Sequence, residues 1–141
     1  MLKTMIIDGT NLILGRAASY AAKQALLGED VNIVNCEGMQ ITGTKADVFE
    51  KYLHKKFDMG LHSKGPFWPK RPDMFVKKTI RGMLPYKQPK GRVAFKKIKC
   101  YIGMPSDLKG KPEILKFASI DKVPNLRYIS LGEVCKRLGW S

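Results

Sequence analysis

Acidic side chains are scarce in this sequence, which has 12 Asp and Glu residues against 26 Lys and Arg residues. The formal net charge is therefore +14 at pH 7. Internal ion pairs cannot balance this excess, and an exposed ion pair returns only about 0–1 kcal/mol of stability. We therefore expect the surplus cations to meet a polyanion, and a nucleic acid is the first candidate.

Long apolar runs are also missing. No run approaches the roughly 20 residues that a membrane-spanning helix needs, so no membrane partner is expected. We expect no secretory leader, because Lys3 is followed by a short strand-like run that ends at Asp8. The hydrophobic content of 44% is typical of a globular protein, and the length predicts a single domain over residues 1–141.

Histidine and cysteine are too few and too scattered for metal or redox chemistry. No carboxylate or thiol pattern around His54 or His62 completes a metal site, so we expect both to be solvated or to lie at helix ends. Cys36, Cys100 and Cys135 are odd in number and widely spaced, which favours small core residues in a reducing compartment over disulfides. No serine lies in a Gly-x-Ser-x-Gly elbow. We therefore predict no enzyme, no cofactor and no small-molecule substrate.

One glycine-rich turn invites comparison with nucleotide-binding loops. Gly9 to Gly15 follows an apolar run and opens a helix, where free amides can bind phosphate. A P-loop has four residues between its glycines and then Lys-Ser/Thr, whereas this turn has five, followed by Arg16. We predict a tight turn in which Arg16 contacts a phosphate backbone. A small α/β nucleotide-dependent RNA-modifying enzyme remains the alternative.

The N-terminal third predicts a strand, a helix and a strand. An apolar run at 4–8 precedes an alanine-rich stretch through Leu27, which Gly28 closes, and a second apolar run follows at 31–34. About 30 residues is the size of one parallel βαβ unit. Small side chains on the inward side let this helix lie close to a sheet: Leu14, Ala18, Ala21, Ala22 and Ala25.

Shorter patterns predict the other elements of the middle of the chain. A brief apolar run at 39–41 and an alternating run at 98–102 predict two more strands, which brings the sheet to about four. A helix is expected near 44–56, where Thr44 and Asp47 resemble a capping pair. Its inward residues would be Phe49, Tyr52 and Leu53.

The last third is punctuated by prolines. Residues 104–125 have little periodicity, so we predict an extended wrap with one edge strand near 114–120. Ser130 and Glu133 form a capping box, which predicts a short C-terminal helix.

Most of the charge lies in one stretch. Residues 55–99 hold fourteen Lys and Arg against two Asp, a net charge of +12, and the other residues together carry only +2. Neutralising six to ten such charges with phosphates would make affinity fall by roughly 10³–10⁵ between 50 and 200 mM salt. This clustering favours a nucleic-acid partner over an ordinary solvated surface.

A basic amphipathic helix is predicted within this stretch. It would begin at Pro72 or Asp73, end at Pro85 and lead into a loop at 86–92. The expected inward residues are Phe75, Val76, Ile80, Met83 and Leu84, and the expected outward ones are Lys77, Lys78 and Arg81. Before this helix, 60–72 is expected to be an ordered surface arm.

Two questions about this region stay open. Phe67, Trp68 and Tyr86 either stack on unpaired bases or anchor loops on the core. A DNA-binding protein that inserts this helix in the major groove is a further alternative, but no helix-turn-helix spacing surrounds the helix, and its basic side chains suit phosphates better than base edges.

The order of several motifs resembles a known family. The run DGTNLILGRAAS at 8–19, VNCE at 34–37, ITG at 41–43, IRGMLP at 80–85 and KGR at 90–92 are similar to large-subunit ribosomal protein thirteen over essentially the whole chain. GPF at 65–67 and the stretch 101–105 are more similar to the archaeal and eukaryotic branch. A start directly on the first strand agrees with an archaeal form.

The resemblance implies a fold and a function. The fold would be a three-layer α/β/α sandwich around a parallel sheet of strand order 3-2-1-4. The protein would be a structural constituent of the large ribosomal subunit in the cytoplasm, would bind its ribosomal RNA and neighbouring ribosomal proteins, and would join early in assembly. Messenger RNA is left open as a further partner.

The residues expected to contact RNA combine this resemblance with the charge pattern. Arg81, Lys87 and Arg92 would bind phosphates, while Gly82 and Gly91 would allow close backbone approach. Met83 and Leu84, within the same motif, are expected in the core. The full predicted set is Arg16, Lys64, Lys70, Arg71, Lys77, Lys78, Arg81, Gly82, Lys87, Lys90, Gly91 and Arg92.

Overall fold

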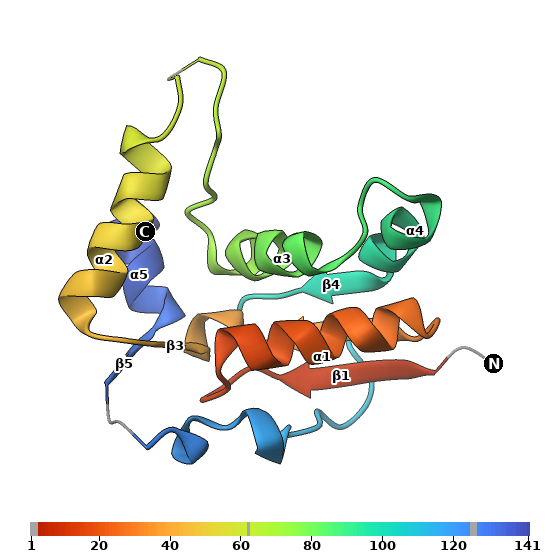
Figure 1. Cartoon of the computed structure of the whole chain (residues 1–141). Coiled ribbons are helices and arrows are strands. Elements are labelled where there is room, and N and C mark those ends of the chain that lie inside the picture. The colour runs from red at the N-terminus through yellow and green to blue at the C-terminus, as the bar shows by residue number, and fades with distance from the viewer. Residues whose placement is uncertain (1–2, 62, 125–126) are drawn as a thin grey trace.

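The computed structural model describes residues 3–61, 63–124 and 127–141 (Figure 1). Predictions that concern His62 and Asn125 lie outside these residues. In the described part of the chain, none of the helices is both long and apolar enough to cross a membrane. The helices and strands are β1 (Thr4–Asp8), α1 (Leu14–Leu26), β2 (Asp30–Val34), β3 (Gln40–Thr42), α2 (Lys45–Leu53), α3 (Pro72–Met83), α4 (Pro89–Lys97), β4 (Ile98–Cys100), β5 (Tyr128–Ser130) and α5 (Leu131–Arg137).

The predicted parallel βαβ unit is confirmed. β1 and β2 pair in parallel, with Ile7 opposite Ile33, and α1 connects them. α1 ends before Gly28, whose φ of +98° is a left-handed conformation that suits glycine. The small side chains of α1 allow the helix to approach the sheet closely, and those that are buried are Ala17, Ala18, Ala21, Ala22 and Ala25.

The parallel sheet differs from the predicted one. Its strands follow the order β1-β2-β4, so the four-strand order 3-2-1-4 is not confirmed. The run predicted as a strand at 39–41 forms β3, which pairs antiparallel with β5. Only residues 35–39, which include the 3₁₀ turn Cys36–Gly38, separate β3 from β2, whereas a parallel crossover needs about a dozen residues or more. A single-residue parallel bridge between Ile7 and Glu113 extends the sheet beyond β1.

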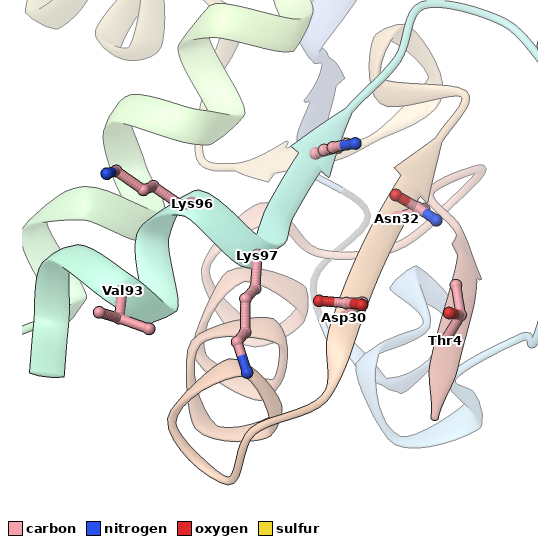
Figure 2. A pocket seen from close by; sticks show the side chains of 7 residues that line it. Thr4, Asp30, Asn32, Val93, Lys96 and Lys97 are labelled. Carbon is pink, nitrogen blue, oxygen red and sulfur yellow. The ribbon is translucent and has the colours of Figure 1, made fainter. Parts of the chain in front are cut away.

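The two faces of this sheet are covered differently. Ile7 and Ile33 face a core shared with α1, and α1 also packs against α3 and α4. Thr4, Asp30 and Asn32 point to the other face, where they line an open cavity of ≈ 460 Å³ (Figure 2). Helices on both faces were predicted, and this is not confirmed, because the second face carries this open cavity, although Ile6 and Val34 on the same face are buried.

β3 and β5 form a second, antiparallel sheet that joins the middle of the chain to its C-terminus. The Leu131 N–H donates to the Met39 carbonyl at 2.7 Å beside this pair. The Ser130 hydroxyl accepts a hydrogen bond from the Glu133 N–H at 3.4 Å, so the predicted cap of the C-terminal helix is confirmed. β5 was not predicted.

α2 agrees with its prediction at the first turn and along the inward side. The Thr44 hydroxyl accepts a hydrogen bond from the Asp47 N–H at 3.4 Å. The helix continues into a π-helical turn, where His54 is exposed and lies 3.4 Å from Asp58. The inward side chains contact the core as expected: Phe49, Tyr52 and Leu53.

Residues 104–124 run along the outer edge of β1 as an extended wrap, as predicted. The Asp8 N–H donates to the Glu113 carbonyl at 3.0 Å, and the Glu113 N–H donates to the Ile6 carbonyl at 2.7 Å. The edge strand predicted near 114–120 is replaced by two short 3₁₀ turns at Lys116–Ala118 and Ile120–Lys122.

Candidate nucleic-acid interface

α3 divides the basic stretch into a buried side and an outer side. Pro72 occupies the first helical position, where the missing N–H is not needed. Met83 was predicted in the core, and this is wrong, because its side chain is 42% exposed. The helix ends at Met83, and Leu84 takes the core position in an extended conformation. The other inward residues are buried as predicted: Phe75, Val76 and Ile80.

The basic side chains of α3 gather on its outer side. Lys77, Lys78 and Arg81 all line one cavity. The Lys77 ammonium lies 4.9 Å from the centroid of the Phe95 ring, and the Lys78 ammonium lies 4.7 Å from the centroid of the Trp68 ring. Aromatic faces attract cations, so both lysines are held in place without a carboxylate.

Tyr86 joins the end of α3 to the start of α4. The Arg81 guanidinium carbon lies 4.1 Å from the centroid of the Tyr86 ring, and Arg92 Nε donates to the Tyr86 carbonyl at 3.1 Å. The loop predicted for 86–92 is shorter than expected, because α4 begins at Pro89. Proline reads as a loop residue but is also favoured at the first position of a helix. The exposed basic residues here are Lys87, Lys90 and Arg92.

The two glycines of the predicted set have different surroundings. A Cβ on Gly91 would lie 2.1 Å from the Pro85 carbonyl oxygen and 3.0 Å from the Tyr86 nitrogen. Gly91 is buried, so its close approach is to its own chain. Gly82 is exposed, and a Cβ there would have nothing within 4 Å. Of these two glycines, Gly82 is the one that presents open backbone to a ligand.

The arm before α3 is fixed to the helices by two lysines. Lys56 Nζ donates to the Trp68 carbonyl at 3.1 Å, and Lys78 Nζ donates to the Phe67 carbonyl at 2.8 Å. The Trp68 ring packs edge-on against Phe75, with centroids 5.5 Å apart. Trp68 therefore anchors the arm on the core, whereas the Phe67 side chain is 67% exposed.

The remaining predicted residues lie at the edges of this region. Lys64 and Lys70 are exposed on the arm, and Arg71 precedes α3, with Nη2 at 3.1 Å from Asp73. Arg16 is exposed on the first turn of α1. Of the predicted set, the structure brings Lys77, Lys78 and Arg81 together at one cavity.

Few of these cations have an acidic partner. Over residues 3–61, 63–124 and 127–141 the structure contains three ion pairs, namely Lys45–Glu133, His54–Asp58 and Arg71–Asp73. Arg71 is the only residue of the predicted RNA-binding set that takes part in one of them.

Lys55 belongs to the same cationic region but was not among the predicted RNA contacts. Burial lowers its pKa, and the positive charges of Lys51 and Lys78 lower it further. Its ammonium lies 4.7 Å from the centroid of the Trp68 ring. Its basic character was visible in the sequence, but its approach to the arm depends on tertiary structure. Mutual repulsion of this kind is relieved by an anion.

The amides of the turn at residues 10–13, which precede α1, are not free. The N–H groups of residues 10–13 all donate to oxygens of the chain itself at 2.8–3.2 Å, namely those of Asp8, Gly38, Gly9 and Ala118. A phosphate would have to displace these bonds and approach the Asp8 carboxylate. The turn at residues 10–13 is therefore a packing element and adds no free amide to those at the start of α1.

Comparison with known proteins finds a family model and several relatives that match this chain. Residues 2–107 match the family model described as Ribosomal protein L13. The chain is 45% identical over 135 residues to the large ribosomal subunit protein uL13 of Haloarcula marismortui, covering 96% of this chain and 90% of the relative. It is 43% identical over 136 residues to the protein of that name from Methanosarcina barkeri, covering 95% and 96%. For Archaeoglobus fulgidus the identity is 41% over 137 residues, covering 96% and 87%.

The fold, the cationic face and these matches together define a ribosomal protein. One family model covers more than half of the chain, and this match identifies the ribosomal protein family to which the chain belongs. The chain belongs to the ribosomal protein L13 family, and the resemblance found in the motifs at 8–19 and 80–85 is confirmed, including its archaeal form.

Proposed function

We propose that this chain is a non-enzymatic, structural constituent of the large ribosomal subunit, located in the cytoplasm as part of that particle. We further propose that it binds large-subunit ribosomal RNA through the α3–α4 cationic surface, and that it meets neighbouring ribosomal proteins early in assembly. This surface comprises Lys77, Lys78, Arg81, Lys87, Lys90 and Arg92.

The observation that carries the proposal is the lack of acidic partners on this surface. Among the described residues, none of the three ion pairs includes one of its six cations. Lys77, Lys78 and Arg81 lie over aromatic rings, an arrangement that leaves their charge uncompensated by acidic groups. Phosphates supply the missing charge, and the names of the relatives agree with a ribosomal location.

The roles differ among residues. Arg81 and Arg92, both held at Tyr86, are suited to bidentate contacts with phosphate oxygens. Gly82 leaves room for a phosphate backbone beside α3. Gly91 acts indirectly, because its small size holds α4 against the loop. Outside the surface, the proposed phosphate contacts are Arg16, Lys64, Lys70 and Arg71.

Sedimentation of a cell extract tests the location. The chain should sediment with the large ribosomal particle in low salt and be released only in strong salt, because phosphate contacts weaken steeply as counterions compete. A chain that stays at the top of the gradient in low salt would contradict the proposal.

A charge reversal tests the surface. Arg81→Glu should weaken binding to large-subunit RNA and lower the slope of log K against log salt by about 1 or more. Lys116→Glu is the matched control, because Lys116 is exposed on the 3₁₀ turn in the wrap beyond β1 (Figure 1) and changes the net charge by the same amount. Equal affinities of the two variants would count against this surface, provided that circular dichroism shows both folded.

Thermal unfolding with added nucleotides tests the enzyme alternative. A ligand at about 100 times its Kd adds about 2.7 kcal/mol of stability. We expect no nucleotide to raise the unfolding temperature, since the amides of the turn at residues 10–13 are already bonded within the chain.

A further inference from the structure

An apolar cavity lies beside the α3–α4 cationic surface. It is formed where the arm, α3 and α4 meet, and its volume is ≈ 430 Å³. Met74 on α3 is 52% exposed and Phe67 on the arm is 67% exposed, although both are large apolar side chains. We name it the arm pocket, and it is lined by Phe67, Trp68, Pro69, Met74, Lys77, Lys78, Arg81 and Phe95.

The walls of the arm pocket are held before any ligand arrives. Lys78 fixes the Phe67 carbonyl and Lys56 fixes the Trp68 carbonyl, at 2.8 and 3.1 Å. The Trp68 ring is wedged against Phe75 in the core. Phe67 is thus largely exposed on a fixed backbone, and a preformed wall lowers the ordering cost of binding.

The chemistry of the lining matches a nucleotide. Three of the lining residues are cations, and none is acidic. The apolar part includes flat rings, on which any base can stack, and the three cations of the same lining can reach the phosphates on either side of that base. An apolar peptide side chain would fit the rings but would leave the three cations without counter-charge.

We propose that the arm pocket holds one unpaired base of the bound RNA, stacked on Phe67, while Lys77, Lys78 and Arg81 contact the flanking phosphates. This inference rests on the proposed RNA-binding function and adds to it a preference for an unstacked nucleotide over a continuous duplex. The deep, narrow major groove of a regular RNA helix does not expose its bases to side chains, so a bulge, loop or strand end is the form that fits.

Two RNA strands of equal length test this proposal with the full-length chain. One carries bases on every ribose and the other is abasic, so that both have the same phosphate charge. By fluorescence anisotropy at fixed salt, the strand with bases should bind roughly 5- to 150-fold more tightly, as expected for one stacked base. Phe67→Ala should remove this preference and leave the affinity for the abasic strand unchanged.

Three controls keep the result specific. Phe117→Ala removes a similarly exposed phenylalanine, 50% exposed and packed on Tyr20 away from the pocket, and should keep the preference. Phe67→Leu keeps apolar area without a flat ring and should lose most of it. In a Trp140→Phe variant, Trp68 is the only tryptophan, and its emission should change with the strand that carries bases but not with the abasic strand.

The outcomes that overturn the proposal are separable. If both strands bind with equal affinity, the proposed stacking of a base in the arm pocket is wrong, whereas RNA binding by the cationic surface is unaffected. If neither strand nor large-subunit RNA binds in low salt, the proposed function fails as well. Uridine monophosphate binding as tightly as the strand would identify a free nucleotide as the occupant, and displacement of the strand by a neutral apolar peptide would identify a protein segment.

Discussion

Replacing Gly91 with alanine should destabilise the protein, although alanine is the better helix former. The new Cβ would lie 2.1 Å from the Pro85 oxygen, whereas ordinary contact begins at 3.4 Å. Backbone cannot rotate away as a side chain does, so the cost lies near the upper end of the range for overpacking, about 3 kcal/mol. Alanine returns about 1 kcal/mol of helix propensity. The net loss is about 2 kcal/mol, or about 6 °C in Tm at roughly 3 °C per kcal/mol for this chain length.

Gly82→Ala provides the matched control. Gly82 lies near the end of α3, and nothing approaches its Cβ position within 4 Å. The same substitution there should raise stability by about 0.5–1 kcal/mol, since only the propensity gain remains. Urea unfolding followed by circular dichroism measures both variants. If the RNA backbone lies against Gly82, this stabilised variant should nevertheless bind large-subunit RNA more weakly.

The two substitutions should change stability in opposite directions, because a Cβ at position 91 meets backbone and a Cβ at position 82 meets nothing. A Gly91→Ala variant as stable as the parent would show that α4 does not pack on the Pro85 carbonyl as described. A role for Gly91 in direct backbone contact with RNA would then have to be considered again. A stability loss in Gly82→Ala would instead place an unrecognised neighbour beside α3.

Three further outcomes are expected. A hydrogen bond with the Cys100 thiol and burial raise the pKa of Cys36, and burial raises the pKa of Cys135 to about 12. At pH 8 iodoacetamide should therefore label neither Cys36 nor Cys135 in the folded protein. Labelling of Cys135 in the native protein would contradict this expectation. Burial acts to raise the pKa of Asp8, but hydrogen bonds from Thr10 and Asn35 outweigh it and lower the pKa. The stability that Asp8 contributes is therefore present above about pH 4 and is lost as the pH falls through the lowered pKa. Asp8→Asn should make the free energy of unfolding, measured with urea, depend less on pH in the acid range. Ser130→Ala removes the cap of α5 and should cost about 1 kcal/mol in the same assay, whereas an unchanged midpoint would show that the Glu133 N–H bond contributes nothing.

Elements with a strong local pattern were predicted well. The apolar run of β1, the alanine side of α1 and the capping pair at Thr44 each carry their own signal within a few residues. β5 carries none, because three residues make its strand and its partner β3 is distant in sequence. The strand order 3-2-1-4 was implied by the family resemblance and is not confirmed; the sequence pattern itself could not supply an order, because strand pairing is decided by long-range contacts.

The candidate site was predicted in part. The spacing of Lys77, Lys78 and Arg81 placed them on one side of a helix, and the structure agrees. Spacing could not show that α3 ends one residue before Leu84, which leaves Met83 outside the core. Spacing also could not predict that Trp68 packs on the core while its neighbour Phe67 is exposed, because this depends on tertiary contacts.

The pairing of β3 with β5 has a consequence for folding during translation. The ribosome synthesises residues 40–42 long before 128–130, and β3 cannot form its antiparallel partnership until the latter emerge. The βαβ unit and α3 can pack earlier, whereas the Leu131 bond to Met39 closes only at the end of translation. A nascent chain halted before residue 128 would therefore hold an unpaired strand edge, which is a site for binding by a chaperone or for mispairing with another chain.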